Sequence, residues 1–333
     1  MTTLKTRDII ALGFMTFALF LGAGNIIFPP IVGIAAGENL LGASIGFLLT
    51  GVGLPLLGVV ALARVGGGLD TLTQPIGRFA GVALACAIYL TIGPLFATPR
   101  TATVSFEMGL APFVGNTPLN LLIFTIAYFS LVLVLSLFPG KLMDNIGKII
   151  TPVLIVALAI LGGAAFVAPA GGYSTATADY GTQAAAFAQG FLQGYQTMDA
   201  LASLVFGIVI VNAIKAAGVT SRQLHTRYAI YAGVIAATGL GLVYVSLLYL
   251  GATSGTLATN AATGVQILTA YVQLTFGAAG MWLLAAVIML ACLTTGVGLV
   301  SACSAFFSEL TGFSYRGVVV ALSIFSAVVA NQG

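Results

Sequence analysis

The chain has 333 residues, of which 59% are hydrophobic and only 6% are charged. Soluble domains carry about 25% charged residues, so this composition excludes a soluble globular enzyme and indicates a polytopic membrane protein. The formal net charge of +3 is spread along the chain, which argues against a nucleic-acid-binding protein, because such proteins gather basic residues on one face.

Uncharged or nearly uncharged stretches that are long enough to cross a bilayer recur along the chain. They predict an all-α polytopic membrane protein with about nine spanning helices, at residues 9–33, 40–63, 80–111, 119–138, 149–168, 184–211, 228–251, 278–308 and 317–333. A shorter stretch, 265–277, is predicted to form a helix that lies at the membrane surface. The unbroken apolar runs exclude a β-barrel, whose strands alternate in hydrophobicity.

The basic residues predict how these spans are oriented. Ten of the eleven Lys and Arg residues fall in loops on the same side of the predicted topology as the N-terminus. Loops rich in Lys and Arg stay in the cytoplasm, so the N-terminus is predicted to be cytoplasmic. The eleventh, Arg100, lies within span 3.

Span 1 contains a sequence that forms helix poorly. Gly22, Gly24 and Asn25 are followed by Pro29 and Pro30 at the depth of the membrane interior. Unpaired backbone groups persist there only where they line a cavity. The free N–H groups of a half-helix attract an anion such as a carboxylate, and the free carbonyl groups attract a cation. Alternatively, the glycines allow close packing between helices.

Span 6 has a similar interruption between residues 189 and 199, with two glycines and several polar residues. Because five positions separate the two interrupted spans, they run in opposite directions through the membrane. This pattern predicts an inverted repeat of five helices, with 1–168 as the first repeat and 184–333 as an incomplete second repeat. Residues 1–333 together are predicted to form a single transmembrane domain.

Span 8 has a set of small oxygen-bearing residues on one face. Ala291, Thr294 and Thr295 are spaced i, i+3 and i+4, so they lie on the same side of a helix. One carbonyl and two hydroxyl groups could bind a small hard cation such as Na⁺. Alternatively, the threonine hydroxyls bond to the preceding turn of their own helix.

Three ionisable residues lie within spans, where each costs about 2.5–3.5 kcal/mol at the bilayer centre on insertion scales. Arg100 and Glu107 are seven residues apart and are predicted to form an ion pair along one face of span 3. Asp199 begins the second half of span 6. It is interpreted either as the N-cap of that half-helix or as a proton carrier or cation contact.

The remaining reactive residues give no sign of an enzyme. Cys86, Cys292 and Cys303 all lie in apolar stretches and are predicted to be core thiols. The single histidine, His225, cannot form a histidine metal cluster. The two carboxylates within spans, Glu107 and Asp199, belong to different spans and have no partner motif. No resident cofactor is expected.

Three segments resemble a known family. Residues 7–30, with Gly22-Ala23-Gly24-Asn25, residues 93–101 and residues 194–201 are similar to the bacterial branched-chain amino acid:cation symporters. The resemblance implies uptake of leucine, isoleucine and valine across the inner membrane, driven by Na⁺ or H⁺. It also implies the leucine-transporter-type five-plus-five fold. Members of this family have about twelve spans, so it further implies that the chain lacks spans 10 to 12.

The resemblance assigns residues to two sites. The carboxylate of the substrate is expected at the break in span 1 and its amino group at the break in span 6. The substrate-binding residues would be Gly22, Ala23, Gly24, Asn25, Gln193, Gly194, Tyr195, Gln196 and Thr197. A sodium ion would be bound by Ala18, Leu21, Ala291, Thr294 and Thr295.

The expected partners are leucine, isoleucine, valine and membrane lipid, without nucleic acid or an obligate protein partner. Two other functions remain open. One is a passive facilitator, which would need a continuous polar pore. The other is a fragment or sensor that binds the substrate without moving it.

Overall fold

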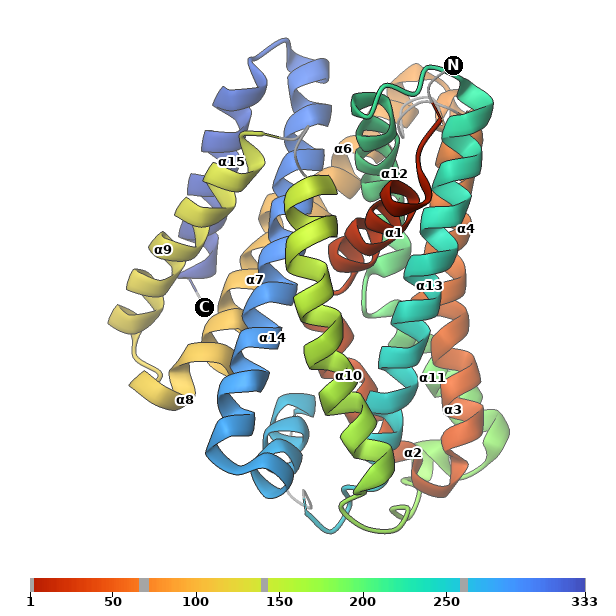
Figure 1. Ribbon diagram of the computed structural model, residues 1–333, viewed down its shortest axis with the longest axis vertical. Coiled ribbons are helices and arrows are strands. Elements are labelled where there is room, and N and C mark those ends of the chain that lie inside the picture. Colours follow the sequence, from red (N-terminus) through yellow and green to blue (C-terminus); the bar gives the residue numbers. More distant parts are fainter. Residues whose placement is uncertain (1–2, 66–71, 139–142, 258–262, 333) are drawn as a thin grey trace.

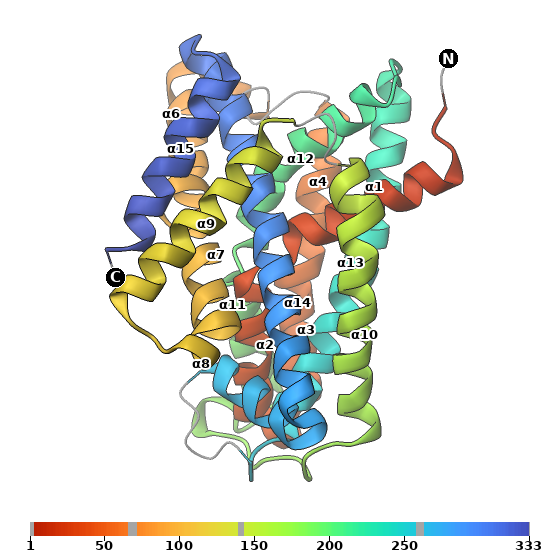
Figure 2. The same ribbon diagram turned by 60° about the vertical axis from the view of Figure 1, so that its left-hand side comes forward.

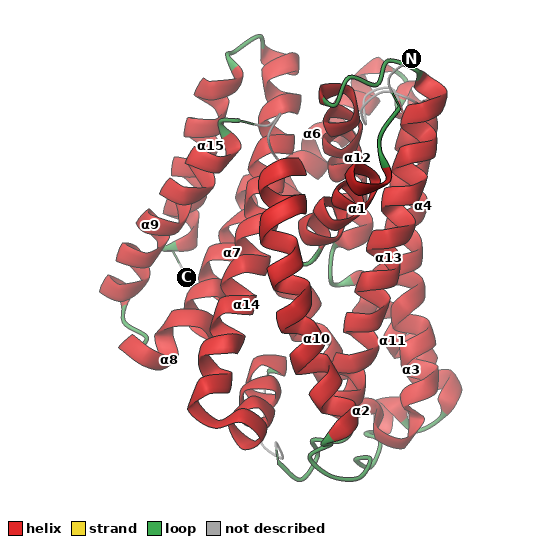
Figure 3. Ribbon diagram, viewed as in Figure 1, coloured by secondary structure: helices red, strands yellow, loops and turns green. Residues whose placement is uncertain are grey.

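The computed structural model describes residues 3–65, 72–138, 143–257 and 263–332. Nearly all of these residues are helical, and none of them lies in a strand (Figure 3). The helices form one elongated bundle (Figure 1). In chain order they are α1 Thr6–Phe20, α2 Ala23–Ala36, α3 Leu40–Leu48, α4 Leu54–Val65, α6 Arg78–Leu90, α7 Ala97–Ser105, α8 Ala111–Val114, α9 Pro118–Ser136, α10 Thr151–Val167, α11 Gln183–Tyr195, α12 Asp199–Ala216, α13 Arg222–Ala252, α14 Gly264–Thr311 and α15 Tyr315–Ala330.

Seven helical segments of the described chain are long and apolar enough to cross a membrane. They are Ala23–Val65, Arg78–Val114, Pro118–Ser136, Ile146–Val167, Asp199–Ala216, Arg222–Ala252 and Gly264–Thr311. The helix α15 is a shorter apolar helix of 16 residues, and α1 and α11 are short helices that each precede a break. All nine predicted spans fall on these helices, so the prediction of an all-α membrane protein is confirmed.

The first span is broken near its middle. Helix α1 ends at Phe20 and α2 begins at Ala23, so only Leu21 and Gly22 lie between the two helices. The Asn25 side chain closes the start of α2, because its Oδ1 accepts a hydrogen bond from the Gly22 N–H at 3.0 Å. The break that the sequence predicts in span 1 is therefore present.

Two more interruptions occur later in the chain. Helix α11 ends at Tyr195 and α12 begins at Asp199; between them, Met198 has a φ of 65°, the one positive φ outside glycine in the described chain. Helix α14 bends sharply at Gly277, where φ is 60°. This bend separates a short arm from the long helix, in agreement with the separate helix predicted at 265–277.

Close packing between helices depends on several glycines. A Cβ atom at Gly33 of α2 would lie 2.0 Å from the carbonyl oxygen of Leu248, and one at Gly251 of α13 would lie 2.2 Å from that of Pro30. Helices α3 and α11 meet in the same way, through Gly42, Gly46, Gly190 and Gly194. Small residues thus bring the backbones of these two helix pairs into direct contact.

The helix ends that carry basic residues gather at one end of the bundle. The C-terminal ends of α4, α12 and α14 and the N-terminal ends of α6, α10, α13 and α15 all lie at the upper end in Figure 1. The basic residues at or next to these ends are Arg64, Arg78, Lys148, Lys215, Arg222, Arg227 and Arg316. This arrangement agrees with the predicted distribution; Lys141 lies outside the described residues.

Candidate functional site

A cavity of about 50 Å³ lies where the breaks in spans 1 and 6 meet. The two breaks approach closely, since a Cβ atom placed on Gly24 would lie 3.3 Å from the carbonyl oxygen of Thr197. Helices α7 and α14 complete the walls. The lining residues are Phe20, Gly22, Ala23, Gly24, Asn25, Ile92, Ala97, Arg100, Thr101, Thr197, Met198, Asp199, Ala202, Phe206, Thr295 and Leu299.

The N-terminus of α2 opens onto this cavity. Ala23 and Gly24 lie in its first turn, where backbone N–H groups have no acceptor within the helix. The aligned peptide dipoles make this end of the helix electropositive. All four residues predicted to bind a carboxylate, from Gly22 to Asn25, line the cavity.

A buried polar cluster ties three helices together beside the cavity. Asp199 Oδ2 accepts hydrogen bonds at 2.6 Å from the Asn25 side-chain amide of α2 and at 2.6 Å from the Tyr244 hydroxyl of α13. The amide of Asn25 also contacts the Tyr244 hydroxyl. The N-cap interpretation of Asp199 is wrong, because Met198 occupies the N-cap position and the carboxylate of Asp199 bonds across helices instead.

Five oxygen atoms converge where α14 crosses the end of α1. The Thr294 hydroxyl lies 2.9 Å from the Ala18 carbonyl oxygen and 3.0 Å from that of Ala291. The Thr295 hydroxyl lies 3.4 Å from the Ala18 carbonyl oxygen and 3.1 Å from that of Leu21. These are the five residues predicted to bind Na⁺. A set of hydroxyl and carbonyl oxygens, without nitrogen or sulfur, suits a hard cation.

The break in span 6 lies later in the chain than predicted. Of the five residues from Gln193 to Thr197, only Thr197 lines the cavity. Gly194 packs on α3, where a Cβ atom would lie 2.5 Å from the Phe47 carbonyl oxygen, and Tyr195 and Gln196 are exposed. The structure therefore places Gln193, Gly194, Tyr195 and Gln196 outside this cavity, because helix α11 continues through Tyr195.

The predicted ion pair between Arg100 and Glu107 is absent. The one ion pair between described side chains joins Asp8 and Lys148, at 3.3 Å. Arg100 lines the cavity, whereas Glu107 is exposed. Seven residues of helix rise about 10.5 Å, which is farther than the i, i+3 and i, i+4 pairs that meet on one face.

Sequence reasoning missed the apolar wall of the cavity. This wall consists of Phe20 of α1, Ile92, Ala97, Met198, Ala202 and Phe206 of α12, and Leu299 of α14. Such residues carry no local pattern that separates the lining of a cavity from an ordinary core. Together they provide a nonpolar surface next to the electropositive end of α2.

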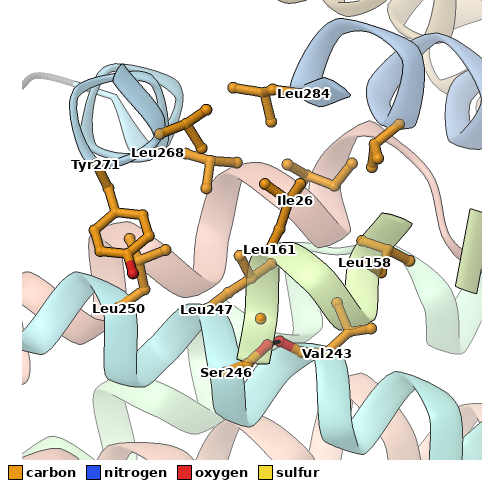
Figure 4. Close-up of a pocket in the computed structure, with 13 residues that line it drawn as sticks. Ile26, Leu158, Leu161, Val243, Ser246, Leu247, Leu250, Leu268, Tyr271 and Leu284 are labelled. Carbon is orange, nitrogen blue, oxygen red and sulfur yellow. Dashed lines mark hydrogen bonds between the residues drawn. The ribbon is translucent and has the colours of Figure 1, made fainter. Parts of the chain in front are cut away.

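A second cavity lies on the other side of α2, between α10, α13 and α14 (Figure 4). Its two hydroxyl groups are already satisfied by backbone carbonyls: Ser246 bonds to Val243 at 2.8 Å and Tyr271 bonds to Ala168 at 2.9 Å. The other lining residues, including Ile26, are apolar or glycine. This cavity therefore offers no group that would bind the charges of an amino acid.

The bundle and its paired broken helices define a helical membrane protein with the leucine-transporter-type fold. A solved structure of MhsT in complex with L-phenylalanine matches with a TM-score of 0.55, over 96% of this chain and 78% of that chain, at 16% sequence identity. This likeness concerns the fold. A family model described as branched-chain amino acid transport protein matches residues 5–333, and the chain belongs to this family.

Individual relatives agree with this assignment. The chain is 66% identical over 333 residues to the branched-chain amino acid transport system 2 carrier protein of Pseudomonas aeruginosa, covering 100% of this chain and 76% of that protein. It is 58% identical over 330 residues to the branched-chain amino acid permease BrnQ of Salmonella typhimurium, covering 99% of this chain and 75% of that protein. These relatives are carriers and permeases, so the chain is a transporter and not an enzyme.

Proposed function

We propose that this chain binds leucine, isoleucine and valine in the cavity between α2 and α12 and carries them across the bacterial inner membrane together with Na⁺. The observation that carries the proposal is the meeting of two broken helices around one cavity, directly beside a cluster of five oxygen atoms. The gathering of basic helix ends supports a cytoplasmic N-terminus.

The proposed binding mode follows from the groups that line the cavity. The N–H groups of Ala23 and Gly24 would bind the substrate carboxylate. The Thr197 carbonyl oxygen and the Asp199 carboxylate, at the opposite break, would face the ammonium group. The apolar wall with Phe206 would take the branched side chain. One methylene in such a pocket changes binding by about 1–3 kcal/mol, so all three amino acids should be accepted.

The five oxygen atoms of Ala18, Leu21, Ala291, Thr294 and Thr295 would bind the sodium ion. In the structure the threonine hydroxyls donate to the carbonyl oxygens of the same set. A cation could replace these hydrogen bonds if the hydroxyl protons turned away. The bound ion would contribute positive charge close to the break in span 1.

Proton coupling is the second candidate. Asp199 is buried, with a 3% exposed fraction, and its hydrogen bonds link α2, α12 and α13. A carboxyl group in this position could exchange its proton as the three helices move. In that case the oxygen cluster at Thr294 and Thr295 would have only a structural role.

The test is leucine binding to the purified chain in detergent, measured in Na⁺ and in matched choline. Tighter binding in Na⁺ supports sodium coupling. Equal binding in both salts, with a dependence on pH that disappears in Asp199→Asn, supports proton coupling instead. Absence of leucine binding in both salts contradicts the proposed function. Accumulation of leucine against a gradient in proteoliposomes then separates a coupled transporter from a passive facilitator.

A further inference from the structure

Arg100 is a basic residue in the lining of the proposed substrate cavity. Arg100 lies on α7, just after a bend where Gly93 leaves the helical conformation and Pro94 follows. The bend sets α7 at the cavity, where Arg100 and its neighbours Ala97 and Thr101 form part of the lining. An arginine at this depth of a spanning segment is costly unless its charge is balanced.

No acidic side chain among those described forms an ion pair with Arg100, whose Cζ atom lies over the Phe28 ring in a cation–π contact. The one described ion pair, between Asp8 and Lys148, lies elsewhere. Glu107 is on the same span but exposed. Asp199 lines the same cavity, but its carboxylate forms no ion pair with Arg100 and accepts hydrogen bonds from Asn25 and Tyr244 instead.

Arg100 also lies close to the electropositive end of α2. Its Cζ atom is 5.4 Å from the centre of the Phe28 ring, and Phe28 is one helical turn after Gly24. A Cβ atom on Gly24 would lie 3.5 Å from that same ring. Arg100 of α7 and the first turn of α2 therefore line one cavity from two helices. Two positive features so arranged repel each other and attract an anion.

We propose that Arg100 binds the carboxylate of the transported amino acid, together with the backbone N–H groups of Ala23 and Gly24. This inference rests on the proposed function of the cavity. The planar fork of a guanidinium group matches the two oxygens of a carboxylate. Arg100 would thus make the site specific for ligands with a free carboxylate, while the apolar wall recognises the side chain.

The experiment compares leucine with leucinamide, which has the same side chain and ammonium group but no carboxylate. Binding of both to the full chain in detergent is measured for the unmodified protein, Arg100→Gln and Arg100→Lys. We expect Arg100→Gln to weaken leucine binding about 10- to 100-fold, the loss typical of a hydrogen bond to a charged group. Leucinamide binding should change little, so the preference for leucine falls. Arg100→Lys keeps the positive charge and should recover part of the preference for leucine over leucinamide.

Glu107→Gln is the matched control, because it removes the acidic residue seven positions away on the same span. It should leave both affinities unchanged. The inference is overturned if Arg100→Gln keeps the preference for leucine, or if it weakens both ligands equally, as a purely structural role would. If Gly24→Leu abolishes leucine binding while Arg100→Gln binds like the unmodified chain, only this inference fails. If the unmodified chain binds no leucine, the proposed function fails with it.

Discussion

The hydroxyl group of Thr294 lies 2.9 Å from the carbonyl oxygen of Ala18, although 276 residues separate them in the chain. Ala18 is in the last turn of α1, where carbonyl groups have no partner within the helix. Thr294 is fully within α14, and its neighbour Thr295 reaches the Leu21 carbonyl oxygen in the same way. The broken end of span 1 is thus held by the hydroxyl face of span 8.

Replacing Thr294 with valine should strongly weaken the effect of Na⁺ on leucine binding. Valine keeps the shape of threonine and removes one oxygen ligand of the cation. The loss should cost roughly 1.5–3 kcal/mol of binding free energy, which lowers the affinity for Na⁺ about tenfold or more. Leucine binding in choline should remain. Thr238→Val is the control, because that hydroxyl is exposed and bonds only to Val234 of its own helix. A sodium effect that survives in Thr294→Val contradicts the assignment.

Substitution of Gly24 should reveal how closely the substrate approaches α2. In Gly24→Ala the new methyl group would lie 3.3 Å from the Thr197 carbonyl oxygen, which a small shift can accommodate. We expect the Gly24→Ala variant to bind leucine more weakly. The Gly24→Leu variant should show no measurable leucine binding, because its side chain would fill the cavity. Gly163→Leu is the control, because nothing lies within 4 Å of its Cβ position. Leucine affinity that is unchanged in Gly24→Leu would place the substrate elsewhere.

Removing the hydroxyl group of Tyr244 should lower stability. The Asp199 carboxylate would lose one of its two cross-helix donors while remaining buried. Hydrogen bonds to charged groups contribute about 1.5–3 kcal/mol, so thermal unfolding of Tyr244→Phe in detergent should occur at a lower temperature. Tyr231→Phe, on the same helix with an exposed side chain, should differ by less than about 0.5 kcal/mol. Equal unfolding temperatures for all three proteins would show that this hydrogen bond is not needed.

Gly33 should not tolerate even a methyl group. Its added Cβ would lie 2.0 Å from the Leu248 carbonyl oxygen, and backbone atoms cannot rotate aside as a side chain can. Alanine there must push α2 away from α13, at a cost of about 1–3 kcal/mol or more. Gly241→Ala, on α13 with nothing within 4 Å, is the control. The yield of folded protein and the unfolding temperature measure the effect, and wild-type values for Gly33→Ala would contradict the packing described.

The membrane fold and the span 8 part of the oxygen cluster could be predicted from local patterns in the sequence, whereas Ala18 and Leu21 were assigned through the family resemblance. Apolar length marks a span, and the spacing of Ala291, Thr294 and Thr295 on a helix fixes their common face. The break at Gly22 is likewise marked by its own residues. The division into repeats at 1–168 and 184–333 stays a prediction.

The rest of the site depends on contacts that no local pattern records. Gly194 was expected to break the helix, but it packs against α3 instead. The break occurs at Met198, a residue type that does not predict a positive φ. The sequence also does not show that Glu107 is exposed, so Arg100 was assigned to Glu107 instead of to the cavity. Phe206 and Leu299 could be recognised as cavity residues only once the helices were placed.

The interruption between α1 and α2 is only two residues long, and each of these residues belongs to a different proposed site. The Leu21 carbonyl oxygen belongs to the cation cluster, and the Gly22 residue next to it lines the amino acid cavity. When one ligand fixes the conformation of Leu21 and Gly22, it also fixes the groups that the other ligand binds. Thermodynamic linkage then requires that Na⁺ strengthen leucine binding by the same factor by which leucine strengthens Na⁺ binding.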